Sequence, residues 1–145
     1  MKLKIKKLRE NAVIPQRATE GSAGCDLCAC IDSDITIKKG EIVKIPTGIA
    51  VQPDTNNVAL LIYARSGLAS KFGITLANCV GVVDSDYRGE IIVPLINLGS
   101  EDFIIENGTR IAQLVVTPVI LPEISVVSEL SDTARGEGGF GSTGK

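Results

Sequence analysis

Short apolar runs separated by turn residues recur along the whole chain. Residues 2–6 alternate lysine with leucine and isoleucine, which predicts a half-exposed strand whose lysines protect a sheet edge. Residues 58–64 are almost continuously apolar, which predicts a strand buried on both faces. Short strands at regular spacing, interrupted by proline and glycine, are typical of an all-β sandwich, barrel or jelly roll. The other expected strands are residues 26–31, 35–37, 41–45, 49–51, 103–105 and 111–119.

Only one segment has a convincing helical pattern. We expect Ser66 to cap a short helix that runs from Gly67 to a stop at Gly73. The preceding strand brings Arg65 and Ser66 to the helix N-terminus, where a guanidinium, a hydroxyl and free backbone N–H groups together suit an anion. An exposed arginine beside an ordinary cap explains the segment equally well, so the segment alone leaves both interpretations open.

A polar segment between two apolar runs carries the most concentrated chemistry. It reads Asp84-Ser85-Asp86-Tyr87-Arg88-Gly89. Its position predicts the tip of a β-hairpin held on buried strands. Asp84 ends the first apolar run, so partial desolvation there would favour a general base. Two aspartates before a glycine also form ordinary Asx-type turns, and for this motif alone the turn is the better interpretation.

Composition and charge narrow the class of protein. The 145 residues carry a net charge of −2 and have a pI near 5.2, so we expect one domain with no general attraction to nucleic acid or to an anionic membrane. No apolar run is long enough to span a membrane and no signal peptide is evident, which favours a cytoplasmic protein. Aromatic residues are scarce, so the core must come from Ile, Val, Leu and Ala.

Four cysteines raise the question of a metal site. Cys25, Cys28 and Cys30 lie close together, but the chain has no histidine and only Cys79 remains as a fourth ligand. Small apolar side chains in a strand are therefore the better explanation.

The C-terminal residues differ from the rest in composition. Residues 128–145 are rich in Ser, Asp, Gly and Thr, which predicts a flexible arm attached to a β-barrel domain of residues 1–127. Residues 139–145 match part of a P-loop, but they lack its Ser or Thr and its flanking strand and helix, so that interpretation fails. Arg135, Phe140 and the glycines suit an arm that closes over phosphates and stacks on a ring. A plain flexible tail is the simpler alternative.

Five segments resemble, in order, the five motifs of the trimeric deoxyuridine triphosphatase (dUTPase) family. They are residues 23–27, 65–68, 78–89, 110–113 and 135–144. Each match is weak alone, but five at compatible spacing are specific. The resemblance implies a jelly-roll-like β-barrel with one short helix and a homotrimer whose active sites are shared between subunits. It also implies Mg²⁺-assisted hydrolysis of dUTP to dUMP and pyrophosphate, which would limit uracil in DNA and supply dUMP for thymidylate synthesis.

The resemblance also implies a role for each matching residue. Asp84 would activate the water that attacks the α-phosphorus. Tyr87 would pack on the deoxyribose and leave no room for a 2′-hydroxyl, and Asp26 would lie near a metal that the substrate phosphates and waters hold. The other expected substrate contacts are Asn78, Gly81, Val83 and Phe140 for the nucleoside, and Arg65, Ser66, Gly67, Gln113, Arg135, Gly141, Ser142 and Thr143 for the phosphates.

Two alternative functions share most of this pattern. The dCTP deaminases have a similar fold, but Pro94 stands where their catalytic glutamate would be, and proline cannot transfer a proton. A regulatory module that binds dUTP without hydrolysing it is disfavoured because Asp84 and the arm are both intact.

The sequence departs from the dUTPase motifs at few positions. Ala64 replaces an expected proline, and Cys25 and Cys28 occupy variable positions, so no functional group is lost.

Overall fold

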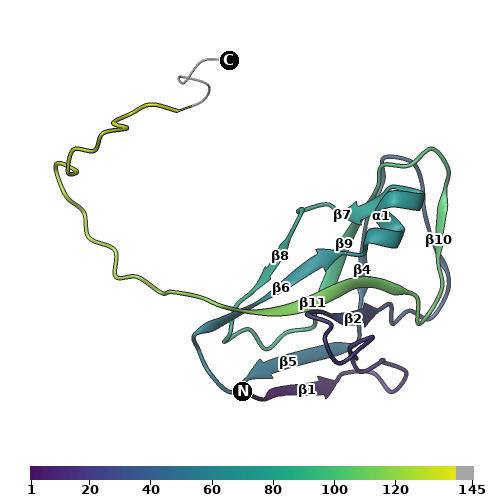
Figure 1. Ribbon diagram of the computed structural model, residues 1–145. Coiled ribbons are helices and arrows are strands. Elements are labelled where there is room, and N and C mark those ends of the chain that lie inside the picture. Colours follow the sequence, from purple (N-terminus) through teal and green to yellow (C-terminus); the bar gives the residue numbers. More distant parts are fainter. Residues whose placement is uncertain (140–145) are drawn as a thin grey trace.

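The computed structural model describes residues 1–139, which form eleven strands and one short helix (Figure 1). The predicted all-β class, with a single short helix, is therefore confirmed. The strands are β1 (Leu3–Lys7), β2 (Cys25–Cys28), β3 (Ile35–Ile37), β4 (Ile42–Pro46), β5 (Ile49–Pro53), β6 (Val58–Ala64), β7 (Ile74–Leu76), β8 (Gly81–Val83), β9 (Ile92–Asn97), β10 (Phe103–Ile105) and β11 (Arg110–Pro118), and the helix is α1 (Ser66–Phe72). Apart from α1, no helix occurs in this part of the chain, and α1 is far too short to cross a membrane.

The strands pair antiparallel in four small sheets. The largest has the order β2-β11-β6-β8, and a second has the order β4-β9-β7. Two further pairs, β1-β5 and β10-β3, lie at different ends of the body (Figure 1). In the largest sheet the central strand β11 aligns Gln113 with Asp26 on one neighbour and with Tyr63 on the other. Residues directly opposite one another share a face, so these three side chains are grouped on one side of the sheet.

The core consists of aliphatic side chains, as the composition predicts. Cys28 and Cys30 are buried with them, which agrees with their interpretation as small apolar residues. In β6 the core-facing residues Leu60 and Ile62 are buried, and on the other face Ala59 is buried but Leu61 and Tyr63 are only half-buried. The expected burial on both faces therefore holds only for the first part of the strand. The largest fully buried side chains are Leu27, Ile37, Ile45, Ile49, Leu60, Ile74, Leu76, Leu95, Ile105, Ile111, Leu114 and Val93.

The predicted hairpin around residues 81–97 is wrong. β8 pairs with β6, whereas β9 pairs with β4 and β7, so the two strands belong to different sheets. The intervening loop crosses from one sheet to the other, and just before β9 Ile91 donates its N–H to Ile49 O, at the start of β5, at 2.9 Å. Each apolar run finds a partner strand elsewhere in the chain, and those pairings override the local hairpin signal.

The helix ends as predicted but begins differently. Gly73 adopts a left-handed conformation with φ of 70° and closes the C-terminus. At the other end Arg65 occupies the N-cap position with an extended backbone and no side-chain cap, and Ser66 is already the first helical residue. The expected capping role of Ser66 is therefore wrong, and its exposed hydroxyl and the first-turn N–H groups are left for another partner.

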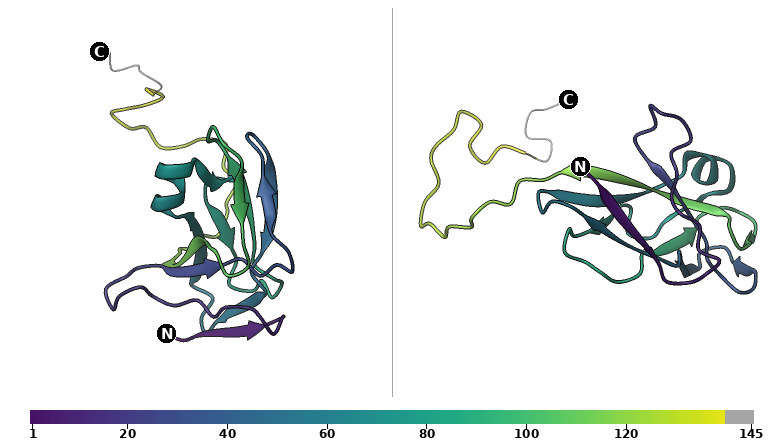
Figure 2. Two further views of the ribbon diagram at one scale, coloured as in Figure 1. Left: turned by 90° about the vertical axis from the view of Figure 1, so that its right-hand side faces the viewer. Right: turned by 90° about the horizontal axis from the view of Figure 1, so that it is seen from below.

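After β11 the chain leaves the body. Two further views show this segment leading away from the strands (Figure 2). Residues 120–137 are exposed throughout, and they include apolar side chains such as Ile124 and Val126. Residues 140–145 lie outside the described part of the chain, so the flexibility of the arm stays a prediction.

Candidate active site

A polar cavity of about 400 Å³ lies on the outer face of the largest sheet, beside the start of α1. Its wall contains all the residues that the sequence predicts to bind phosphates, apart from those in the C-terminal arm. Arg65, Ser66 and Gly67 come from the β6–α1 junction, because β6 ends there and the helix begins at once. Gln113 and Asp26 come from the adjoining strands β11 and β2. The cavity therefore collects guanidinium, hydroxyl, amide and backbone N–H donors, which suit a polyphosphate.

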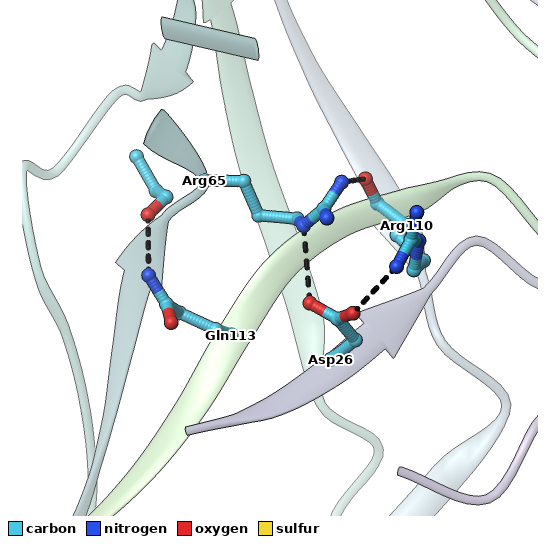
Figure 3. A network of polar contacts seen from close by, with 5 residues as sticks. Asp26, Arg65, Arg110 and Gln113 are labelled. Atoms are coloured by element: carbon cyan, nitrogen blue, oxygen red, sulfur yellow. Dashed lines mark hydrogen bonds and ion pairs between the residues drawn. The ribbon is translucent and has the colours of Figure 1, made fainter. Parts of the chain in front are cut away.

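Asp26 is the centre of a charged network in this cavity (Figure 3). One of its oxygens accepts a hydrogen bond from Arg65 Nε at 3.0 Å, and the other accepts one from Arg110 Nη1 at 3.2 Å. Arg65 also donates from Nη1 to the backbone oxygen of Arg110 at 3.3 Å. All three side chains are partly exposed, so these pairs contribute little to stability and mainly fix the direction of the Arg65 guanidinium.

Arg110 lies in this site, although no role for it was predicted from the sequence. It lines the same cavity, and its side chain is 58% exposed. The signal was present, since Arg110 is one of three polar residues, with Gln113 and Thr117, in an otherwise apolar strand. Its partner Asp26 is distant in sequence, however, so only the fold shows that the two side chains meet.

Gln113 is held in a fixed orientation. Its Nε2 donates to Ala64 O at 3.0 Å (Figure 3). A Cβ at Gly24 would lie 2.8 Å from Gln113 Oε1, so a larger residue there would force this amide to shift. The first and fourth sequence motifs are therefore in direct contact here.

The cysteines near this cavity do not form a metal centre. Within residues 1–139 no group of three or more His, Cys, Asp or Glu side chains is placed to hold a metal ion. Burial raises the pKa of the Cys28 thiol, and the nearby Asp26 carboxylate raises it further, against the weaker opposing effect of Arg110 and Arg65. Cys28 is therefore a neutral thiol that packs beside the network.

A second cavity, of about 250 Å³, lies at the loop between β8 and β9. It contains the residues predicted to contact the nucleoside, apart from Phe140 in the arm. Its floor is apolar, with Ile62 and Leu76 among the lining side chains. Pro94 is also in the wall. This mixture of an apolar floor and a polar rim suits a base and a sugar. The predicted residues in the wall are Asn78, Gly81, Val83, Asp84 and Tyr87.

Asp84 is exposed in the single chain, so the partial desolvation expected from its sequence position is not present there. Its backbone oxygen accepts a hydrogen bond from Tyr87 N at 3.1 Å, which closes a backbone turn. Within residues 1–139 its carboxylate accepts no hydrogen bond, so the side chain does not form the Asx-type turn considered above. The carboxylate is left to point its lone pairs at solvent or at a ligand.

The Tyr87 ring is fixed by its own loop. Its hydroxyl donates to Glu90 O at 3.1 Å. A Cβ on Gly89 would overlap the Tyr87 hydroxyl, so the ring lies directly over this glycine. Arg88 closes the loop by donating from Nη1 to Ser85 O at 2.8 Å and to Tyr87 O at 2.9 Å.

The two cavities lie on opposite faces of strand β6. Ile62 lines the cavity that contains Asp84, and its chain neighbour Tyr63 lines the cavity that contains Arg65. Successive side chains of a strand point to opposite faces of the sheet. No residue lines both cavities. In one copy of the chain, the predicted nucleoside residues and the predicted phosphate residues are thus separated by the sheet itself.

Of the predicted arm residues only Arg135 is in the described part of the chain, and it lines neither cavity. Arg135 is exposed on the segment that leads away from the body, and its Nε donates to Gly138 O at 2.7 Å. Phe140, Gly141, Ser142 and Thr143 lie outside the described residues.

Comparison with known proteins gives one consistent result. A family model described as dUTPase matches residues 10–144. A deoxyuridine 5′-triphosphate nucleotidohydrolase from Desulfitobacterium hafniense is 53% identical over 146 residues, covering 99% of this chain and 97% of the relative. The protein of that name from Burkholderia cenocepacia is 46% identical over 143 residues, with the same coverage. The Staphylococcus bacteriophage 80alpha dUTPase with dUPNHPP superposes with a TM-score of 0.88 at 29% identity, covering 99% of both chains.

Proposed function

This chain belongs to the dUTPase family and hydrolyses dUTP to dUMP and pyrophosphate, and we propose that each of its active sites combines residues of two copies. The observation that carries the proposal is the separation of the two cavities by strand β6. A nucleoside held beside Asp84 cannot extend its phosphates through the sheet to Arg65 of the same chain. The phosphates would reach that cavity on a neighbouring copy instead.

The phosphate half of the site binds and orients the substrate. Arg65 has N–H donors left over after its bonds to Asp26 and Arg110, and it directs them into the cavity toward the phosphates. Ser66 and Gly67 add a hydroxyl and first-turn N–H groups. These fixed donors stabilise the charge that develops on the phosphoryl oxygens as water attacks and pyrophosphate leaves in line.

The nucleoside half selects the substrate and supplies the base. Asn78 and the backbone around Gly81 and Val83 bind the uracil edge, and Tyr87 packs against the deoxyribose. Asp84 accepts the proton of the water that attacks the α-phosphorus. Contact with a neighbouring copy and with the nucleotide would bring this exposed carboxylate next to the attacking water when the site is assembled.

Mg²⁺ fits this donor set as an ion carried mainly by the substrate. Asp26 already accepts one hydrogen bond on each oxygen, but a carboxylate oxygen has a further lone pair for a metal-bound water. Magnesium retains most of its waters and binds phosphate oxygens readily, so a preformed cluster of carboxylates is not needed. When bound, the ion neutralises phosphate charge and orients the triphosphate.

A trimer would cover apolar surface that the single chain exposes. Ile42 on β4 and Ile92 on β9 lie on the outer face of the same sheet and are 57% and 48% exposed. Val82 on β8 is 66% exposed at the rim of the nucleoside cavity. Several exposed apolar side chains of this size on one molecule are typical of an interaction surface. We therefore propose that the neighbouring copies cover this surface and complete the sites beside it.

The sharing of sites is testable with two variants that are each expected to be inactive. An Asp84→Asn chain keeps its phosphate half, and an Arg65→Gln chain keeps its nucleoside half. If equal amounts are unfolded and refolded together, about a quarter of the sites combine the two intact halves, so about a quarter of wild-type turnover should return. Each variant refolded alone is the control, and light scattering should give the mass of three chains. If trimers form but no turnover returns, each active site is built from a single chain and the proposal is wrong.

The C-terminal arm would complete the site from outside. Arg135, Phe140, Gly141, Ser142 and Thr143 are proposed to close over the phosphates and the base once the nucleotide is bound. An arm that starts in an exposed segment can reach a neighbouring copy, and closure would exclude all water except the nucleophile.

The direct test of the reaction is pyrophosphate release from dUTP, with dCTP, dTTP and UTP as comparators. We expect fast release from dUTP and slow release from the other three nucleotides. Ammonia release from dCTP should not occur, because Pro94 occupies the cavity wall and has no group that transfers a proton. Equal rates with dUTP and UTP would contradict the proposed contact between Tyr87 and the deoxyribose.

A further inference from the structure

The loop that carries Tyr87 is joined to a distant turn by four hydrogen bonds. Glu90 accepts at Oε1 from the backbone N–H of Gly48, at 2.7 Å. The next residue, Ile91, donates to Ile49 O at 2.9 Å and accepts at its own oxygen from Thr47 Oγ1 at 2.6 Å and from Thr47 N at 3.2 Å. The turn between β4 and β5 therefore determines where residues 90 and 91 lie.

That turn is packed closely against the core. Thr47 is buried, and Gly48 has a φ of 70°, a backbone conformation that strongly favours glycine. A Cβ at Gly48 would lie 2.7 Å from Cys30 Sγ and 2.8 Å from Ala12 Cβ, so the backbone packs directly against the core. Glu90 is thus bonded to a rigid part of the fold rather than to another loop.

The main chain of Glu90 in turn fixes the Tyr87 ring. The Tyr87 hydroxyl donates to Glu90 O at 3.1 Å, and the ring packs against Gly89, where a Cβ would overlap it. The same residue therefore bonds the ring through its backbone oxygen and the rigid turn through its carboxylate. A ring that excludes a 2′-hydroxyl must be held firmly, because a small displacement would admit the extra oxygen.

We propose that Glu90 is a positioning residue for sugar selection: its carboxylate, bonded to Gly48 N–H, holds the Tyr87 ring where it excludes a ribose. This inference rests on the proposed contact of Tyr87 with the deoxyribose. It assigns Glu90 no contact with the reacting atoms. The carboxylate acts as a hydrogen-bond acceptor in this role, and its negative charge is not needed.

The acceptor role is testable with three substitutions and the ratio of kcat/KM for dUTP to that for UTP. Glu90→Gln keeps an acceptor oxygen at the same distance, so the ratio should stay within about twofold of wild type. Glu90→Ala removes the acceptor, and we expect the ratio to fall by about tenfold, the equivalent of one modest hydrogen bond. Glu90→Asp keeps the charge but withdraws the oxygen by one methylene, so the ratio should fall as well.

The order of the variants distinguishes the possible roles. If Glu90→Asp keeps the ratio and Glu90→Gln loses it, the charge is what matters and the proposal is wrong. An unchanged ratio in both Glu90→Ala and Glu90→Asp would also overturn it. Should Glu90→Ala not fold, the comparison of Asp with Gln still decides. Glu106→Ala, the same change at an exposed site away from both cavities, should leave the ratio unaltered.

One further variant separates this inference from the function on which it rests. Tyr87→Ala should abolish most of the preference for dUTP. If the ratio of kcat/KM for dUTP to that for UTP is unchanged in Tyr87→Ala, Tyr87 does not contact the sugar. The proposed nucleoside site is then wrong, whatever the role of Glu90. If Tyr87→Ala loses the preference but Glu90→Ala and Glu90→Asp retain it, only the inference about Glu90 fails.

Discussion

Replacing Asp84 by Asn is expected to lower dUTP turnover by about 10²–10⁴-fold, the usual loss when a general base is removed, and to leave nucleotide affinity nearly unchanged. The amide has almost the size of the carboxylate, so the wall of the nucleoside cavity keeps its shape. It cannot accept the proton of the attacking water. Turnover and the dissociation constant of a non-hydrolysable dUTP analogue, measured on the same preparation, separate these two effects.

The neighbouring aspartate provides a matched control. Asp86 is exposed in the same loop but does not line the cavity, so Asp86→Asn removes the same charge two residues away. We expect that variant to retain most of its turnover. Full turnover in Asp84→Asn would refute the assignment of the base, and equal losses in both variants would indicate a general effect of charge on the loop.

Replacing Arg65 by Gln is expected to lower turnover by about 10²–10³-fold, since removal of one preorganised donor to a developing anion costs that much in other enzymes. Glutamine also loses both bonds that orient the guanidinium, to Asp26 and to Arg110 O. The loss should appear mainly in kcat if Arg65 acts on the transition state, and mainly in KM if it only binds the ground-state triphosphate.

The same helix supplies the control for this prediction. Lys71 lies in the last turn of α1 and is exposed, so Lys71→Gln removes one positive charge from the opposite end of the helix. Its turnover should match that of the unaltered protein. A loss in Lys71→Gln as large as that in Arg65→Gln would attribute the effect to net charge rather than to the directed guanidinium.

Local pattern predicted those features that depend only on neighbouring residues. The apolar run of residues 58–64 coincides with β6, and Gly73 ends the helix because a left-handed residue is needed there. The predicted nucleoside and phosphate residues within residues 1–139, Arg135 apart, line two separate cavities, and each group comes largely from one or two sequence motifs; their binding roles stay predictions.

Features that depend on distant pairings were not predictable in this way. The sequence of β8 and β9 suggests a hairpin, but in the fold β8 pairs with β6 and β9 pairs with β7, so the two strands lie in different sheets. The contact between Arg110 and Asp26, and the placement of Asp84 and Arg65 on opposite faces of β6, follow from strand order and register. Register is set by how whole faces are buried, so no short segment contains this information.

The position of β6 between the two cavities has a consequence for how activity depends on the amount of protein. If the sites are shared as proposed, a correctly folded chain that remains alone holds both groups of residues but cannot bring them to one nucleotide. Folding and the onset of activity are then separate events, and the second requires encounters between copies. Turnover per chain would therefore fall on dilution below the dissociation constant of the assembly, and a newly made chain would be inactive until it assembles with other copies.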